Sequence, residues 1–350
     1  MPKSSQKQIP EIPMRIRLLE LAQRVPLFLS PNNQTYVACP TATPIYSEDF
    51  FTWLVCLGEK RLGYVPSAHH VAFVVRSLDT QAHGAKNKES VHTRIAKLAP
   101  KTYQIDLGTD DHQVINITGK QWQPSQHFDA FFERSENSEP SPTTEPTKLT
   151  LANCFEQIFE TSPENSDKLA LWLAEALLPD QQPPILVITG TAREAAIEIL
   201  RQLIDPVLQP IIYTPYSYRE LNQMALENQV LTFSFTSDLS PKFIETLNDL
   251  HQGKRIRLKQ CNKTRPKLGA TIQRPILIAT KKPLQFSPSQ ITIEINTAHQ
   301  TGLGKVFFAL MDLVVQIVGQ PEREKVLRAL AEPGQSALFQ SNEPPDSNTS

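Results

Sequence analysis

The sequence predicts an α/β protein whose main domain is a mostly parallel five-stranded sheet covered by helices, preceded by a small α+β domain. Three observations predict this fold. Five apolar, β-rich runs occupy the second half of the chain with helical periods between most of them, which is typical of a sheet buried on both faces. The first 132 residues mix helical periods with short alternating strands, and a polar segment separates the two regions. The five runs are "ILVIT", "IIYTP", "VLTFSF", "ILIAT" and "ITIEI".

Composition and charge argue against a membrane-spanning, zinc-binding or disulfide-rich protein. Of the 350 residues, 40% are hydrophobic and the net charge is −1, so affinity for nucleic acid or membranes has to be local. No run approaches the roughly 18 apolar residues of a membrane span. Four distant cysteines without a CxxC pair predict neither a zinc site nor a disulfide framework, and favour the cytoplasm. They are Cys39, Cys56, Cys154 and Cys261.

Changes in composition set the expected domain boundaries. The stretch "ERSENSEPSPTTEPTK" offers almost nothing to bury, which is typical of a linker, and both ends of the chain are similarly polar. We expect a flexible leader (1–13), a small α+β domain (14–132), a disordered linker (133–150), the main domain (151–331) and a disordered tail (332–350).

Capping residues predict where several helices begin. Ser47 precedes "EDFFTWLVCLGEKRL" and Ser67 precedes "AHHVAFVVRSL". In the main domain, Asp167 is expected to cap "KLALWLAEALLP". Ser240 is expected to cap "PKFIETLNDLH", with Pro241 in its first turn.

The stretch "ILVITGTAREAAIE" joins a strand to a helix without a phosphate-binding loop. Such a loop needs G-x-x-x-x-G-K-[ST], whose glycines, lysine and hydroxyl hold phosphates and magnesium. Gly190 is the only glycine here, followed by Arg193 and Glu194, so we predict an ordinary turn with both charges on a solvated first helical turn. The strand "VLTFSF" likewise ends at Ser234 instead of the carboxylates that hold magnesium in ATPases, and Asp238 is expected to cap a helix.

Residues 169–320 nevertheless resemble the P-loop ATPase (helicase-like) domain of bacterial phage and mobile-element replication proteins. The resemblance rests on "LALWLAEAL", "PPILVITG", "LRQLIDP", "VLTFS…LSP", "QRPILIAT" and "GKVFFALMDLVVQIV". Upstream, "FFTWL", "VHTRIA" and "YQIDLG…VINITGKQW" follow in the family's order. The resemblance implies a P-loop NTPase-like (AAA+/helicase-like) fold with strand order 5-1-4-3-2, which places "ILVIT" between "ITIEI" and "ILIAT".

The positions that this family uses for nucleotide chemistry are changed throughout. The Gly-rich loop is about three residues short, and each of the polar groups expected for hydrolysis is replaced. The chain has Arg193 near the lysine, Glu194 near the Ser/Thr, Ser234 for the carboxylate, Ala279 followed by Thr280 for the polar sensor, and Ser289 or Gln290 for the arginine. We therefore predict a pseudo-ATPase without catalytic residues or a metal site, in which binding of ATP and magnesium is lost.

One strongly basic segment stands out in this nearly neutral chain. Residues 253–282 contain ten Lys or Arg and no acid, between the third and fourth sheet strands, where related helicases carry a DNA-reaching hairpin. Alternation with apolar residues predicts a strand with one basic face for phosphates. A solvated hairpin that keeps a sheet edge soluble is the alternative. The candidate nucleic-acid contacts are Lys254, Arg255, Arg257, Lys259, Lys263, Arg265 and Lys267.

Three functions remain open from the sequence. The preferred one is a non-enzymatic scaffold, or a DNA- or partner-binding subunit, derived from a DNA-replication ATPase of a mobile genetic element, as a homo-oligomer or with an active relative. The second is a residual ATP binder or slow ATPase in which Arg193 replaces the lysine and Asp238 or Glu194 holds the metal. The third is a stand-alone, sequence-independent nucleic-acid binder that uses the basic segment.

Overall fold

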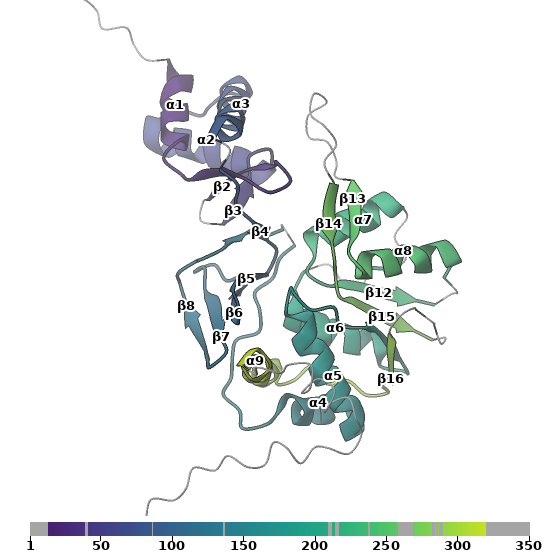
Figure 1. The fold of residues 1–350 in the computed structure, drawn as a ribbon. Helices are drawn as coiled ribbons and strands as arrows, with labels where there is room; N and C mark the ends of the chain where they lie inside the picture. Colours follow the sequence, from purple (N-terminus) through teal and green to yellow (C-terminus); the bar gives the residue numbers. More distant parts are fainter. Residues whose placement is uncertain are drawn as a thin grey trace, which may run out of the picture. The chain divides into compact units, whose positions relative to one another are not determined.

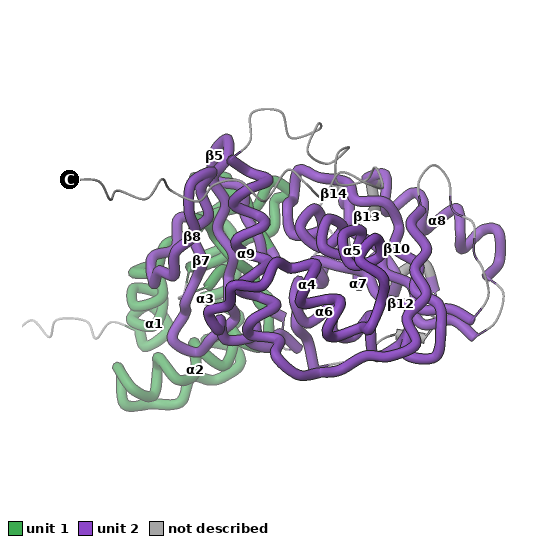
Figure 2. Tube along the Cα trace, turned by 90° about the horizontal axis from the view of Figure 1, so that it is seen from below, with its two compact units in different colours: residues 1–92, 130–134, 256–270 green, residues 93–129, 135–255, 271–350 purple. Residues whose placement is uncertain are grey.

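The computed structural model divides the chain into two compact units. Unit 1 comprises residues 1–92, 130–134 and 256–270, and unit 2 comprises residues 93–129, 135–255 and 271–350 (Figure 2). The residues that the structure describes are 13–38, 41–85, 87–135, 137–208, 212–213, 217–236, 239–257, 269–281, 284, 286 and 290–319.

Unit 1 combines three helices with a small antiparallel sheet in the order β1-β2-β3 and a parallel pair β4-β9 (Figure 1). Two predicted caps are confirmed: Ser47 Oγ accepts from Phe50 N at 3.2 Å, and Ser67 Oγ accepts from His70 N at 3.4 Å. The elements are α1 (Met14–Ala22), β1 (Leu27–Leu29), β2 (Thr35–Ala38), β3 (Ala42–Pro44), α2 (Glu48–Leu62), α3 (Ala68–Ala85), β4 (Val91–His92) and β9 (Phe131–Phe132).

Unit 2 holds the five apolar runs and the helices that cover them. Its first strands are β5 (Ile95–Ala99), β6 (Thr102–Asp106), β7 (Val114–Thr118) and β8 (Trp122–Ser125). The central sheet contains β10 (Ile185–Thr189), β11 (Ile212–Tyr213), β12 (Leu231–Phe235), β15 (Ile276–Thr280) and β16 (Gln290–Glu294). The helices are α4 (Leu151–Phe159), α5 (Pro163–Ala176), α6 (Arg193–Ile204), α7 (Tyr218–Glu227), α8 (Pro241–His251) and α9 (Leu303–Gly319).

The central sheet runs in the order β11-β12-β15-β10-β16, and each neighbouring pair is parallel. Side chains alternate between its two faces, as the period of a strand requires. On one face, Ser234 of β12 bonds to Glu194 of α6. On the other, Phe233 and Phe235 of β12 pack against Phe243 of α8, with ring centroids 6.1 and 5.8 Å apart. Helices therefore cover both faces, and the carboxyl ends of β10, β12 and β15 lie beside the start of α6.

The antiparallel sheet β5-β6-β7-β8 belongs to unit 2, although its strands were expected to belong to an upstream domain ending at residue 132. Its apolar face joins one core with α4, α5, α6 and α9, and α9 contacts both β7 and β8. Ile105, Ile115 and Ile117 of this sheet are each at most 3% exposed. The difference arises because the partner of this sheet is a helix nearly 200 positions later in the sequence, which local patterns do not reveal.

The segment predicted to be a linker follows a defined path along unit 2. Glu139 N donates to Pro206 O at 2.9 Å, Ser141 N to Leu107 O at 2.8 Å, and Glu145 N to Gly304 O at 3.1 Å. A polar segment with few apolar side chains can be fixed in this way, because its backbone groups still need hydrogen-bond partners. The leader and the tail lie outside the described residues, apart from Pro13.

One predicted helix start in unit 2 is wrong and another is confirmed. Asp167 lies inside α5, which begins four residues earlier with Pro163 behind the cap Ser162. The pair Ser-Pro supplies both a capping hydroxyl and the fixed φ of a first helical residue, so it starts the helix before Asp167. Ser240 caps α8 as predicted and accepts from Phe243 N at 3.3 Å. In the described part of the chain, no helix is both long and apolar enough to cross a membrane.

Candidate nucleotide-binding turn

The β10–α6 turn (residues 190–192) is where a phosphate-binding loop would stand. Gly190 has φ +95°, a conformation that side-chain-bearing residues rarely adopt. A Cβ at this position would lie 2.3 Å from Ile295 O and 2.8 Å from Asn296 Oδ1. Glycine is therefore needed here because the chain after β16 approaches the turn closely, which provides a reason for this glycine without any ligand.

Residues that follow β16 occupy the hydrogen-bond donors of the turn. Thr191 N donates to Asn296 Oδ1 at 3.0 Å, and Ala192 N donates to Ile295 O at 3.1 Å. The Thr191 hydroxyl also donates to Asn296 O at 2.9 Å. Backbone N–H groups in this position are the ones that hold phosphate oxygens in nucleotide-binding proteins. Here protein oxygens already satisfy them.

The first turn of α6 differs from the predicted solvated turn. The side chain of Arg193 is only 13% exposed, whereas that of Glu194 is 44% exposed. Arg193 Nη1 donates to Gly190 O at 3.0 Å, and its Nη2 lies 3.5 Å from Glu194 Oε1. Its Nε is buried and has no hydrogen-bond partner within the described residues. The guanidinium is thus folded back onto the turn, because the Gly190 carbonyl and the neighbouring carboxylate attract it.

Glu194 and Ser234 meet at the end of β12. Ser234 is 2% exposed, and its hydroxyl donates to Glu194 Oε1 at 2.9 Å. The pairing places a carboxylate beside the β10–α6 turn, where its charge repels phosphate. Sequence reasoning located both residues but did not predict this contact. Asp238 and Ser289 lie outside the described residues, and among those described there is no cluster of three potential metal ligands.

The basic segment is described only at its two ends. Residues 254–257 form β13 (Lys254–Arg257), which pairs with β14 (Gly269–Ile272) in a two-stranded sheet (Figure 1). The strand predicted for Lys254, Arg255 and Arg257 is therefore present. The candidates that lie outside the described residues are Lys259, Lys263, Arg265 and Lys267.

Sequence reasoning missed a buried charged cluster at the opposite end of α6. Arg94 is 1% exposed, and its Nε lies 3.3 Å from Asp205 Oδ1 at the end of the helix. The same guanidinium donates to Asp106 O at 3.3 Å, to Pro206 O at 2.9 Å and to Glu139 O. We call these residues the Arg94–Asp205 cluster. Arg94 lies within "VHTRIA", directly before β5, and no local pattern in this stretch distinguishes it from an exposed arginine.

A second arginine and a backbone amide add to the environment of Asp205. Gln229 N donates to Asp205 Oδ2 at 2.6 Å. Burial lowers the pKa of Arg274, and the negative charge of Asp205 opposes that shift. Arg274 Nε donates to Ala225 O at 2.9 Å. The cluster therefore ties β5, α6 and the segment containing Glu139 together and has a structural role.

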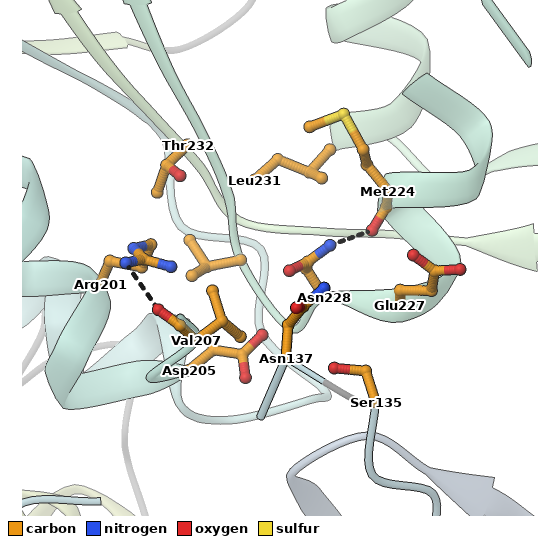
Figure 3. A pocket seen from close by; sticks show the side chains of 11 residues that line it. Ser135, Asn137, Arg201, Asp205, Val207, Met224, Glu227, Asn228, Leu231 and Thr232 are labelled. Atoms are coloured by element: carbon orange, nitrogen blue, oxygen red, sulfur yellow. Dashed lines mark hydrogen bonds between the residues drawn. The ribbon is translucent and has the colours of Figure 1, made fainter. Parts of the chain in front are cut away.

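A small cavity lies beside this cluster, between the end of α6, the end of α7 and the start of β12 (Figure 3). Its volume is about 90 Å³, well below the ~300–1,000 Å³ of small-molecule sites. Arg201 Nη2 and Asn228 Nδ2 donate to backbone carbonyls at its wall, at 3.1 and 2.9 Å (Figure 3). A nucleotide does not fit here. The lining residues are Ser135, Asn137, Arg201, Asp205, Val207, Met224, Glu227, Asn228, Val230, Leu231 and Thr232.

Comparison with known proteins gives only structural neighbours of low similarity. No protein-family model matches the chain, and no curated protein sequence matches it. The apo structure of the NrS-1 C-terminal region is similar at 9% identity and a TM-score of 0.43, covering 91% of this chain and 74% of that one. A full-length MCM homolog from Methanopyrus kandleri has 12% identity and a TM-score of 0.28, covering 87% of this chain and 76% of that one. A JCV helicase has 11% identity and a TM-score of 0.24, covering 52% and 64%. At such values, no site residue of these proteins is transferred to this chain.

Proposed function

We propose that this chain is a non-catalytic scaffold with a P-loop NTPase-like, helicase-like core, derived from a replication ATPase of a mobile genetic element. The observation that carries the proposal is the occupied β10–α6 turn, in which the N–H groups of Thr191 and Ala192 bond to Asn296 and Ile295 and so are not free to hold phosphate. The strand order also supports it: β16-β10-β15-β12-β11 corresponds to the 5-1-4-3-2 order that the sequence resemblance implied. The lost chemistry and the retained core favour a role in assembly with a partner, such as a related active ATPase.

The contacts of Glu194 add a second reason against hydrolysis. An ATPase needs a hydroxyl on magnesium at this point of the helix and a carboxylate at the end of the neighbouring strand. Here the carboxylate of Glu194 and the hydroxyl of Ser234 stand in exchanged places and bond to each other at 2.9 Å. The pair therefore stabilises the contact between α6 and β12 without a metal ion.

Calorimetric titration of the full chain with ATP, with and without magnesium, tests the proposal. We expect no saturable heat at millimolar ATP. Saturable heat that needs magnesium and disappears in Arg193→Ala overturns the proposal and establishes the residual nucleotide binder instead. Arg76→Ala, which removes an exposed arginine of unit 1, is the matched control.

Nucleic-acid binding through the basic segment is a second candidate function. It is favoured by the pairing of β13 with β14, since this pairing brings together the two ends of residues 254–272, which contain seven of the ten cations and no acid. Contacts to phosphates give an affinity that falls steeply with salt. We expect single-stranded or duplex DNA of any sequence to bind with such a dependence.

The matched triple variants separate a local basic site from general charge. Lys254→Ala, Arg255→Ala and Arg257→Ala together are expected to lower both the affinity and the salt slope, which falls by about one unit per lost contact. Replacement of Arg17, Arg24 and Arg76 by alanine removes the same charge from unit 1 and serves as the control. A flat salt response, or an equal loss in both variants, excludes this function.

A further inference from the structure

The segment after β16 (residues 295–299, the strap) is fixed to two helices at once. At its start, Ile295 N extends the parallel ladder by donating to Thr189 O at 2.9 Å. Ile295 is 1% exposed and belongs to the core of unit 2. The strap therefore begins as a continuation of the sheet, and this fixes the position of Ile295 and Asn296 beside the β10–α6 turn.

The oxygens of the strap point at the β10–α6 turn. Ile295 O accepts from Ala192 N, and the Asn296 amide oxygen accepts from Thr191 N. Asn296 Nδ2 in turn donates to Glu294 Oε1 at 3.2 Å, which fixes the orientation of the amide. These two oxygens stand where a nucleotide-binding turn would place phosphate oxygens, since they accept from the same backbone donors.

The far end of the strap is attached to α4. His299 N donates to Ile158 O at 3.0 Å, and His299 Nε2 donates to Glu160 Oε1 at 3.1 Å. Glu160 adopts a left-handed conformation, φ 46°, as the C-cap of α4. Ala298, between the two attachments, packs against the core of unit 2. The strap is thus held on both sides and leads into α9.

We infer that the strap takes the place of a bound phosphate, so that the β10–α6 turn and the start of α6 keep one conformation whether or not nucleotide is present. This inference rests on the proposed loss of nucleotide binding. It explains how the turn stays ordered without a nucleotide, because the strap oxygens accept hydrogen bonds that phosphate oxygens would otherwise accept. The N-cap Ala192 has no side chain to satisfy the first N–H groups of α6. The strap contributes the acceptors just ahead of them.

Backbone amide exchange of Thr191, measured by NMR on the full chain, tests the strap. Asn296→Ala removes the acceptor, and we expect exchange of the Thr191 amide to accelerate about tenfold or more. Asn296→Asp keeps an oxygen in place, so exchange should stay within about twofold of the parent. Gln300→Ala removes an exposed amide side chain four residues away and is the matched control.

Thr191→Val gives a test from the other side of the contact. It removes the hydroxyl that donates to Asn296 O but keeps the shape and the N–H group. We expect faster exchange of the Ala192 amide, because the strap is then held by one hydrogen bond fewer. The inference about the strap is contradicted if the Thr191 amide is unprotected in the parent protein. It is also contradicted if this amide exchanges at equal rates in Asn296→Ala and Gln300→Ala.

The two proposals fail in different experiments. Saturable ATP binding by calorimetry contradicts the proposed function, whatever the exchange rates are. Exchange rates that do not respond to Asn296 contradict the strap, even when no ATP binds.

Discussion

The two ends of α6 are fixed by different kinds of interaction. At its start, the β10–α6 turn bonds to the strap through neutral groups, with Asn296 Oδ1 and Ile295 O as the acceptors. At its end, Asp205 is 2% exposed and pairs with the equally buried Arg94. Sequence reasoning concentrated on the first end and overlooked the second, yet the second carries the buried charges.

The two ends of α6 are expected to contribute differently to the stability of unit 2. A neutral hydrogen bond contributes about 0.5–1.5 kcal/mol net, whereas leaving one member of a buried ion pair without its partner costs about 3–5 kcal/mol. The end of α6 that a nucleotide would stabilise is therefore held by individually weak contacts. The end without any counterpart in nucleotide chemistry holds the helix, the sheet β5–β8 and the Glu139 segment together.

Loss of Arg94 should have the largest effect. Arg94→Met leaves Asp205 buried without its ion pair, and we expect the free energy of unfolding of unit 2 to fall by about 3–5 kcal/mol. Urea unfolding followed by tryptophan fluorescence measures this, with exposed Arg76→Met as the control. The double variant Arg94→Met, Asp205→Asn should recover part of the loss, because the unpaired charge is gone. A loss below 1 kcal/mol for Arg94→Met, within the range of a neutral hydrogen bond, removes the contrast between the two ends.

Gly190→Ala tests the other end of α6 and should have an intermediate effect. The new Cβ meets Ile295 O in a left-handed conformation, and we expect a cost of about 2–3 kcal/mol from strain and displacement of the strap. Gly302 also has a positive φ, 77°, but has open space around its Cβ position. Gly302→Ala should therefore cost only the conformational strain, about 1–2 kcal/mol. Equal melting temperatures for the two variants would show that the strap does not lie against the turn.

Asp167 is a half-buried carboxylate whose surroundings differ from those of the fully buried Asp205. It makes no ion pair within the described residues, and its pKa is raised by burial and then by the charge of Glu156. A raised carboxylate pKa means that ionisation opposes folding, so the destabilisation appears as pH rises through the folded-state pKa. We expect Asp167→Asn to raise the melting temperature by about 1–2 °C at pH 7 and to have no effect below pH ~3.5. A destabilised variant at pH 7 would mean that Asp167 has a favourable partner.

The smallest effect is expected at the attachment of the strap to α4. Hydrogen bonds from His299 and then from Thr297 lower the pKa of Glu160. A lowered carboxylate pKa contributes stability that is present above the unfolded value and lost as pH falls through the folded value. In His299→Ala, the pKa of Glu160 measured by NMR should rise toward its ordinary value. An unchanged pKa would show that His299 does not contact Glu160 in solution.

Local patterns predicted the elements of the fold better than their grouping. The caps Ser47, Ser67 and Ser240 depend on neighbours within four residues, so the sequence reveals them. The cap at Asp167 was mistaken, since the earlier Ser162 and Pro163 satisfy the same requirement. The strand order came from the family resemblance, because periodicity carries no information about which strands are neighbours.

The sequence predicted which residues lie at the candidate site but not which hydrogen bonds they make. Gly190, Arg193, Glu194 and Ser234 all lie around the β10–α6 turn. However, Ser234 bonds to Glu194 across 40 positions, and Thr191 of the turn bonds to Asn296 across 105. Arg94 and Asp205 likewise meet across 111 positions. Such contacts follow from the packing of whole elements, which spacing along the chain does not encode.

The most direct test of the occupied turn follows the amide signals of Gly190, Thr191 and Ala192 by NMR during titration of the full chain with ATP and magnesium. Because the N–H groups of Thr191 and Ala192 are already bonded to Asn296 and Ile295, we predict that the signals of this turn stay in place up to millimolar ATP. Saturable shifts at these three amides, absent in Arg193→Ala, would show that nucleotide displaces the strap and would contradict the pseudo-ATPase.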